Sequence, residues 1–138
     1  MKPIYRNVLA VIVGWLVGVV VNSSIVQLGM GTYPENVDIN NMESLGNFLK
    51  DAGAIYFVYP FLAHAIGTLI GAFVAALISK NRKYGTALII GGLFFIGGAI
   101  MVFMLPAPAW FESLDLIVAY FPMALLGAFL AKSLRRKK

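Results

Sequence analysis

One histidine lies in an apolar part of the chain and is the first residue to consider for chemistry. His64 is the only histidine among 138 residues, and it lies in the stretch YFVYPFLAHAIGTLIGA, residues 56–72. An imidazole changes charge near neutral pH, so it can transfer a proton or bind a polar ligand. An ionisable side chain inside an apolar span is by default a candidate for a functional site. The question is therefore which polar groups can reach His64.

Three roles for His64 follow from the rest of the sequence. In the first, the ring hydrogen-bonds Asn22 or a free backbone carbonyl and joins two helices, a bond that contributes about 0.6 kcal/mol on average in membranes. In the second, His64, Asp115 and also Glu112 form a proton or ligand site. In the third, His64 binds a metal. One histidine and no cysteine are a poor source of nitrogen and sulfur ligands, so we predict neither a metal nor a cofactor.

The motifs of several enzyme classes are absent from the sequence. There is no H-E-x-x-H zinc motif, no G-x-S-x-G nucleophile motif and no glycine-rich phosphate loop followed by lysine. Ser23, Ser24 and Thr68 could act as nucleophiles beside His64, but nothing in the sequence favours this over hydrogen bonds between helices. We therefore predict no catalytic residue.

The composition indicates that lipid surrounds most of the chain. Hydrophobic residues make up 60% of the sequence and charged residues 12%, whereas a soluble domain carries about 25% charge. A helix of about 20 apolar residues crosses the hydrocarbon core, and four segments are long enough: residues 8–30, 54–79, 84–105 and 114–131. We predict an all-α fold, a polytopic integral membrane protein whose single domain (1–138) is a four-transmembrane-helix bundle.

The charged residues divide between the two ends of these spans. The N-terminal segment, the turn at 80–83 and the tail at 132–138 hold ten of the eleven lysines and arginines. The opposite end, with the loops at 31–53 and 106–113, holds the six acids and only Lys50. Because short cytoplasmic loops are enriched in lysine and arginine, we predict cytoplasmic N- and C-termini in a cell inner or plasma membrane.

The same bias explains the net charge of +5. The basic residues flank apolar spans and lack the interleaved aromatic residues that stack on bases. We therefore predict no nucleic-acid partner. The predicted partners are the lipid bilayer and either further copies of the chain or another membrane protein.

The first outer loop, residues 31–53, contains an amphipathic segment. Four apolar residues share one helical face: Met42, Leu45, Phe48 and Leu49. Asn40 followed by Glu43 resembles the start of a capping box. We predict a short amphipathic helix on the outer surface, where it covers the bundle.

The first two spans each carry a stripe of small and polar residues. On one helical face lie Gly14, Gly18 and Asn22 in the first span, and His64, Gly67 and Gly71 in the second. Small residues let helices approach closely in lipid. The two spans run antiparallel, so residues can be counted from the inner boundary of each. The count pairs Gly14 with Gly71, Gly18 with Gly67 or Thr68, and Asn22 with His64. We predict that the spans pack by these stripes, with Asn22 close to His64.

The third and fourth spans bring further residues to the level of His64. This level lies roughly 21–22 Å above the inner boundary, at about 1.5 Å per residue, in the outer half of the membrane. Gly97 and Gly98 reach it and are predicted to pack helices. We predict a polar binding cluster made of His64, Asn22, Asp115, Tyr120, Tyr59, Gln27 and Glu112.

Two prolines lie near the same level. A proline inside a helix removes one backbone hydrogen bond and usually kinks the helix. Pro60 and Pro122 are predicted to free the carbonyls of Tyr56 and Val118. Two kinked helices would open a polar vestibule toward the outer side, although transmembrane prolines are also tolerated without any such role.

Three functions agree with these features. We expect a non-catalytic binding or accessory subunit with an outward-facing polar pocket. The first alternative is a small oligomeric transporter or channel that uses His64 and Asp115. The second alternative is a membrane enzyme that acts on a lipid-borne substrate from the outer side.

Overall fold

The computed structural model describes residues 1–136, and every regular element in that range is helical. The elements are α1 (Pro3–Met30), α2 (Met42–Leu49), the 3-10 helix η1 (Ala54–Phe57), α3 (Val58–Ile78), α4 (Lys83–Met104), α5 (Ala109–Val118) and α6 (Phe121–Arg136). The predicted all-α class is confirmed. Residues 137–138 of the predicted basic tail lie outside the described residues.

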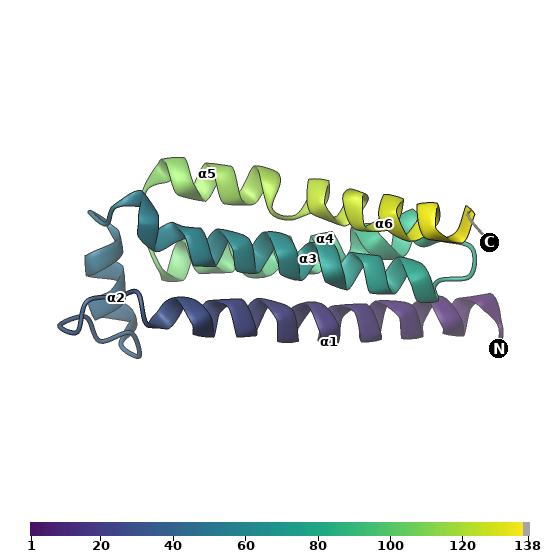
Figure 1. Cartoon of the computed structure of the whole chain (residues 1–138), viewed down its shortest axis with the longest axis horizontal. Coiled ribbons are helices and arrows are strands. Elements are labelled where there is room, and N and C mark those ends of the chain that lie inside the picture. The colour runs from purple at the N-terminus through teal and green to yellow at the C-terminus, as the bar shows by residue number, and fades with distance from the viewer. Residues whose placement is uncertain (137–138) are drawn as a thin grey trace.

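The long helices run side by side in an elongated bundle (Figure 1). The start of α1 and the end of α6 lie at one end, here called the terminal end, and α2 lies at the opposite, loop end. Four helical segments are long and apolar enough to cross a membrane: Pro3–Met30, Ala54–Ile78, Lys83–Met104 and Ala109–Leu134. By length and composition, these segments correspond to the four predicted spans.

The fourth helical segment begins earlier than its predicted span. The sequence predicts a loop at 106–113, but α5 starts at Ala109, directly after Pro108. Glu112 lies in the first turn of α5, and its Oε1 accepts a hydrogen bond from the Ala107 amide at 3.1 Å. An acidic side chain in the first turn stabilises a helix N-terminus, which explains why the polar end of this segment is helical.

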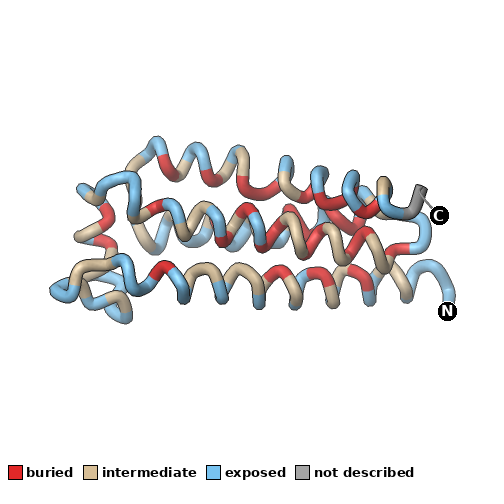
Figure 2. The backbone as a smooth tube through the Cα atoms, in the orientation of Figure 1, coloured by how far each residue is buried: buried red, intermediate tan, exposed pale blue. Residues whose placement is uncertain are grey.

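The central helix of the bundle is α3, which packs on α1, α4 and α6. The buried segments in Figure 2 run along α3 and the facing side of α6. The core between α3, α4 and α6 is built almost wholly of alanine: Ala72, Ala75, Ala76, Ala87, Ile90, Ala124, Ala128 and Ala131. Such small side chains let the helices approach closely.

The contact between α1 and α3 depends on glycine at two levels. A Cβ added at Gly14 would lie 2.6 Å from the carbonyl oxygen of Gly71, and one added at Gly18 would lie 2.8 Å from that of Gly67. Both distances are too short for any other residue at this spacing. The ring of Phe94 on α4 reaches Gly18 from the other side, so α4 is held away from α1 by a large side chain.

The fourth apolar segment is broken at Ala119 and Tyr120. The α5 helix closes with a bond from the Ala119 amide to the Asp115 carbonyl at 2.9 Å. The next helix, α6, begins at Phe121, one residue before Pro122. Since proline has no N–H, it cannot bond the Val118 carbonyl. The disruption predicted at Pro122 is therefore a full break between two helices.

The other proline has a different effect. Pro60 lies in the first turn of α3, directly after the 3-10 turn η1. In a first turn the backbone amide has no partner within the helix, so proline is tolerated there. The kink predicted inside the second span at Pro60 is thus wrong, because the α-helix only begins at Val58.

The loop between α1 and α3 contains the short helix α2. Its N-cap is Asn41, whose Oδ1 accepts hydrogen bonds from the amides of Glu43 (2.9 Å) and Ser44 (3.1 Å). The cap predicted at Asn40 is one residue too early. The amide of Asn40 instead donates to Asp38 Oδ1 at 3.0 Å, in the turn before the helix.

Candidate functional site

Three polar side chains from two segments of the chain meet inside the bundle. His64 Nδ1 lies 2.8 Å from Oδ2 and 2.9 Å from Oδ1 of Asp115. The Tyr120 hydroxyl donates to Asp115 Oδ2 at 2.7 Å and lies 3.0 Å from His64 Nδ1. An ionised carboxylate can only accept hydrogen bonds. With Asp115 ionised, His64 Nδ1 therefore carries a hydrogen and donates it to Asp115.

The three residues of this network are buried to different degrees. Tyr120 is fully buried and Asp115 is 4% exposed, whereas the His64 side chain is 22% exposed. A buried carboxylate is costly unless it is paired and hydrogen-bonded. His64 and Tyr120 supply those partners, so Asp115 is stabilised within the bundle and His64 is the member that a ligand or water can reach.

The break between α5 and α6 helps to bring Tyr120 to Asp115. Residues five apart point about 140° away from each other on a continuous helix, so an unbroken segment would separate the two side chains. Gly98 on α4 completes the arrangement, because a Cβ added there would collide with the Tyr120 hydroxyl. The Tyr120 ring packs edge-on against Phe95, with ring centroids 5.9 Å apart.

The network forms part of the wall of a cavity of about 280 Å³ in the loop-end half of the bundle. Much of the wall is apolar and includes Met30, Leu45, Leu49, Phe57, Met101 and Phe111. Its charged or ionisable side chains, apart from Tyr33, are His64, Asp115 and Glu112, and no lysine or arginine within residues 1–136 lines it. The cavity therefore combines an apolar body with one acidic region.

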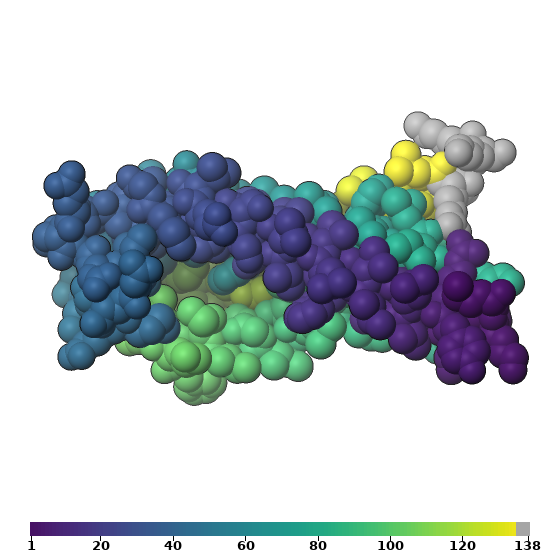
Figure 3. Space-filling view, turned by 90° about the horizontal axis from the view of Figure 1, so that it is seen from below, coloured from purple at the N-terminus to yellow at the C-terminus, as the bar shows by residue number. Residues whose placement is uncertain are grey.

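One side of the cavity lies between α1 and α4. Val26 and Met30 of α1 and Met101 and Val102 of α4 line it there. Figure 3 shows a hollow between these helices in the same half of the molecule. Access is therefore from the flank of the bundle, between two apolar helices.

The loop end of the cavity is covered by α2. Its residues Met42, Leu45 and Leu49 line the cavity, and an aromatic cluster fixes the loop around it. Within this cluster, Tyr33 stacks on Tyr56 at 5.8 Å between ring centroids, and Phe48 packs edge-on against Tyr56 at 4.9 Å. Burial raises the pKa of the Tyr33 phenol, so this cavity-lining group stays protonated well above neutral pH.

The orientation of the histidine determines what the site can do. Asp115 holds Nδ1, and Nε2 of His64 makes no hydrogen bond within residues 1–136. In the neutral ring with Nδ1 protonated, Nε2 accepts a hydrogen bond, and in the charged ring it donates one. The carboxylate fixes the orientation of the ring. The arrangement can thus bind a polar group or pass on a proton.

Metal binding and nucleophilic catalysis find less support in the described residues. No group of three histidine, aspartate or glutamate side chains among them could hold a metal ion. His64 hydrogen-bonds only Asp115 and Tyr120 there, so no serine or threonine is held beside it as a nucleophile. The Ser24 hydroxyl donates instead to the Val20 carbonyl at 2.8 Å.

The structure brings together only part of the predicted cluster. His64, Asp115 and Tyr120 are in direct contact, and Glu112 lines the same cavity. Two other predicted residues do not line it. Tyr59 lies against Gly29 of α1, and Gln27 is exposed. Both are at a suitable level along their helices but on other faces.

Asn22 forms no hydrogen bond with His64 within the described residues. Its Cβ lies 2.9 Å from the position of a Cβ added at Gly67, three residues along α3 from His64. Its buried Oδ1 has no hydrogen-bond partner within the described residues.

The two glycines predicted to pack α4, Gly97 and Gly98, lie in different surroundings. A Cβ added at Gly98 would collide with Tyr120, whereas one added at Gly97 would have nothing within 4 Å. Gly97 is exposed. Only Gly98 therefore lies at a packing contact, since neighbouring residues point about 100° apart on a helix.

Sequence reasoning missed most of the apolar wall. Met42, Leu45 and Leu49 lie on the face predicted for the short helix, and that periodicity was a usable signal for a cover over the site. Tyr33 had no such signal, because it lies in an irregular turn whose path depends on tertiary contacts. Met30 and Met101 are apolar residues of predicted spans, with no feature that separates cavity from lipid.

Comparison of the chain with protein-family models, with curated proteins and with solved structures finds no match.

Proposed function

We propose that the chain is a four-span integral membrane protein with both termini in the cytoplasm, and that it binds a small amphiphile in the cavity beside His64. Its orientation follows from the ten basic residues at the terminal end and the six acids at the loop end. In this orientation the cavity lies in the outer half of the membrane, and α2 covers it from outside. The protein then acts as a non-catalytic binding or accessory subunit.

The observation that carries this proposal is the pairing of an apolar cavity with a buried polar network in its wall. Ligand sites are mostly apolar and hold a few polar groups that orient the ligand. At about 280 Å³, the cavity is near the lower end of the range of ~300–1,000 Å³ for such sites. It therefore suits a short-chain molecule.

The charges in the cavity favour one class of ligand. Asp115 and Glu112 are two acids, His64 carries at most one positive charge, and no lysine or arginine of the described part of the chain lines the cavity. A protonated amine would offset the excess negative charge and donate hydrogen bonds to carboxylates, which are stronger than neutral ones. The ligand we propose is thus a small amphiphile with an amine head and an apolar tail.

The test compares two probes of equal chain length on the purified full chain in mild detergent. We expect n-hexylammonium to bind about tenfold or more tightly than n-hexanol, because hydrogen bonds to charged groups contribute ~1.5–3 kcal/mol. Titration calorimetry measures both affinities. Asp115→Asn removes the charge at nearly constant volume and should abolish the preference for the amine.

The matched control is Asp51→Asn, which removes an exposed acid outside the cavity. This variant should retain the preference of the unmodified chain. Equal binding of the two probes, or equal loss in both variants, would contradict the proposed site.

A second candidate function is transport, favoured by the helix break beside the network. Discontinuous membrane helices often form the binding sites of transporters, and a histidine paired with a carboxylate can relay protons. Reconstituted vesicles with a pH-sensitive dye inside measure proton flux. A flux that His64→Gln abolishes would support this alternative, and no flux between pH 5 and 8 in the unmodified chain would leave binding alone.

A further inference from the structure

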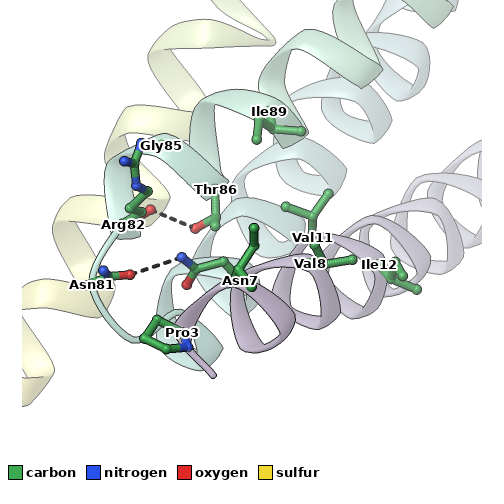
Figure 4. Close-up of a pocket in the computed structure, with 11 residues that line it drawn as sticks. Pro3, Asn7, Val8, Val11, Ile12, Asn81, Arg82, Gly85, Thr86 and Ile89 are labelled. Atoms are coloured by element: carbon green, nitrogen blue, oxygen red, sulfur yellow. Dashed lines mark hydrogen bonds between the residues drawn. The ribbon is translucent and has the colours of Figure 1, made fainter. Parts of the chain in front are cut away.

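A second opening lies at the terminal end of the bundle, away from the cavity. It is a groove of about 610 Å³ between the first turns of α1 and α4. Figure 4 shows that its side chains come from these two helices and from the turn before α4. Phe94, which fills the space against Gly18, lies between this groove and the cavity. The two openings are therefore separate sites along one seam.

The groove is polar where it meets the turn at residues 79–82. Asn7 Nδ2 donates to Asn81 Oδ1 at 3.0 Å, and Asn7 Oδ1 accepts from the Ser79 hydroxyl at 3.0 Å. The Thr86 hydroxyl donates to the Arg82 carbonyl at 3.1 Å. The two bonds of Asn7 hold the turn against α1, and the Asn7–Asn81 bond is drawn in Figure 4. Together with the Thr86 hydroxyl they give the groove a polar end.

The rest of the groove is apolar. Its walls toward the middle of the bundle are Val8, Val11, Ile12 and Ile89. Gly85 leaves the groove wide, because a Cβ added there would meet only the Arg82 Cβ, at 3.7 Å. A polar end at the level of the first helical turns, followed by an apolar channel, matches the arrangement of a lipid headgroup and its acyl chain.

The charge at this end selects the kind of lipid. Lys2, Arg6, Lys80 and Arg82 belong to the start of α1 and to the turn before α4, at the terminal end of the bundle, and all six acids of the chain lie toward the other end. Arg82 lines the groove, and no carboxylate side chain forms an ion pair with it within the described residues. An uncompensated arginine at this position favours an anion.

We propose that this groove binds one anionic phospholipid, with the phosphate near Arg82 and Asn81 and one acyl chain along Val8, Ile12 and Ile89. Basic pockets between membrane helices on the cytoplasmic side are suited to anionic headgroups. The inference rests on the membrane placement proposed above, but it is independent of the ligand in the cavity. Its occupant is a structural lipid that fills the open part of the α1–α4 seam.

The experiment uses the full chain purified in mild detergent and exchanged into vesicles of phosphatidylglycerol and phosphatidylcholine in equal amounts. Native mass spectrometry after gentle re-extraction counts the lipids that remain bound. We expect one phosphatidylglycerol per chain and no retained phosphatidylcholine. Retention of both lipids to the same extent would overturn the proposal.

Two glycine variants on α4 test the groove itself. Gly85→Leu fills the groove without meeting backbone and should remove the bound lipid. Gly92→Leu places the same side chain on the same helix, where an added Cβ has nothing within 4 Å, and should keep the lipid. A dimer that dissociates in Gly85→Leu without any change in lipid would show that a second copy fills the groove and would overturn the lipid assignment.

Two charge variants test the headgroup contact. Arg82→Gln should lower phosphatidylglycerol retention about fivefold, the effect of one basic residue near an anionic surface. Lys2→Gln removes a cation at the same end that does not line the groove and should have a smaller effect. Equal effects would mean general surface attraction, and displacement of the lipid by millimolar inorganic phosphate would mean a free-anion site; either result rejects the proposal.

The membrane placement is checked separately. The chain should remain in the membrane pellet after alkaline carbonate extraction. Release into the supernatant would reject the membrane placement itself, whereas a retained chain without bound phosphatidylglycerol would reject only the lipid site.

Discussion

The helix α1 has two neighbours, and it meets them in opposite ways. Against α3, glycines at two levels bring the backbones into contact. Against α4, the ring of Phe94 fills the middle of the seam, and the seam opens into a groove at one end and contributes to a cavity at the other. Helix α1 thus packs tightly against α3, whereas spaces remain between α1 and α4. We call the α1–α3 contact the closed interface and the α1–α4 seam the open one.

This difference separates a tightly packed interface from one that leaves space beside it. Glycine-mediated contact leaves no room for a ligand and depends on backbone shape alone. A seam held apart by one large side chain leaves space above and below it, and polar residues lie in both spaces. We therefore expect substitutions along α1–α3 to act on stability and substitutions along α1–α4 to act mainly on binding.

The largest expected effect is in the closed interface. Gly71→Leu would bring a Cβ to 2.8 Å from the Gly14 carbonyl oxygen, and backbone cannot yield easily. Forced overpacking of this kind typically costs ~1–3 kcal/mol, and we expect the upper end of that range. Reversible unfolding in mixed micelles measures the loss of free energy.

Gly92→Leu on α4 is the matched control, because an added Cβ there meets no atom within 4 Å. It should change the free energy of unfolding by less than about 0.5 kcal/mol, as surface substitutions do. Similar losses in the two variants would mean that α1–α3 contact is no tighter than the rest of the bundle.

The next largest effect concerns the polar network in the open half. Asp115→Ala removes the acceptor that His64 Nδ1 and the Tyr120 hydroxyl share. An imidazole with Nδ1 unprotonated can accept from the Tyr120 hydroxyl, 3.0 Å away, so one of the two bonds to the carboxylate is lost without replacement. Each unsatisfied buried group costs ~1–3 kcal/mol, reduced where water enters, so we expect a loss of about 2 kcal/mol. Asp115→Asn retains an oxygen acceptor and should lose less than half as much.

Thermal unfolding of both variants in the same detergent is the measurement. If Asp115→Asn and Asp115→Ala were equally destabilised, charge would matter more than hydrogen bonding in the network. If neither changed stability, the network would have no structural role, and any effect on binding would be direct.

The features that could be predicted from the sequence are those that depend only on regular helix geometry. Apolar length predicts the four long helices, since it depends only on the chain itself. Glycine spacing and depth also pair Gly14 with Gly71, and these residues lie in contact. Both inferences need only regular helix geometry.

The site was less predictable because its parts depend on irregular backbone. Asp115 and Tyr120 meet across a helix break whose direction the sequence does not specify. Tyr59 and Gln27 share the level of His64 but lie on other faces, because small rotations of a helix move a side chain out of a site. The cover formed by α2 depends on a loop whose path is fixed by aromatic contacts.

A smaller effect is expected for the hydroxyl of Tyr120. Tyr120→Phe removes the hydrogen bond to Asp115 but leaves His64 as a partner of the carboxylate. Side-chain hydrogen bonds between membrane helices average about 0.6 kcal/mol, and we expect a loss of that size. The affinity for n-hexylammonium should change little, because the charge of Asp115 remains. A loss of binding as large as that of Asp115→Asn would assign the hydroxyl a direct contact with the ligand.

The smallest effect is expected for Asn22 of α1, which packs against α3. Its side chain packs against Gly67, and its Oδ1 has no hydrogen-bond partner within the described residues. Asn22→Ala therefore removes a buried acceptor that contributes no bond, and the free energy of unfolding should change by no more than about 0.5 kcal/mol in either direction. Unfolding of Asn22→Ala and of Gly71→Leu in the same mixed micelles allows their free energies of unfolding to be compared directly. A loss above about 1 kcal/mol would reveal a partner for Asn22, such as His64 or a bound water, and would place Asn22 in the polar network after all.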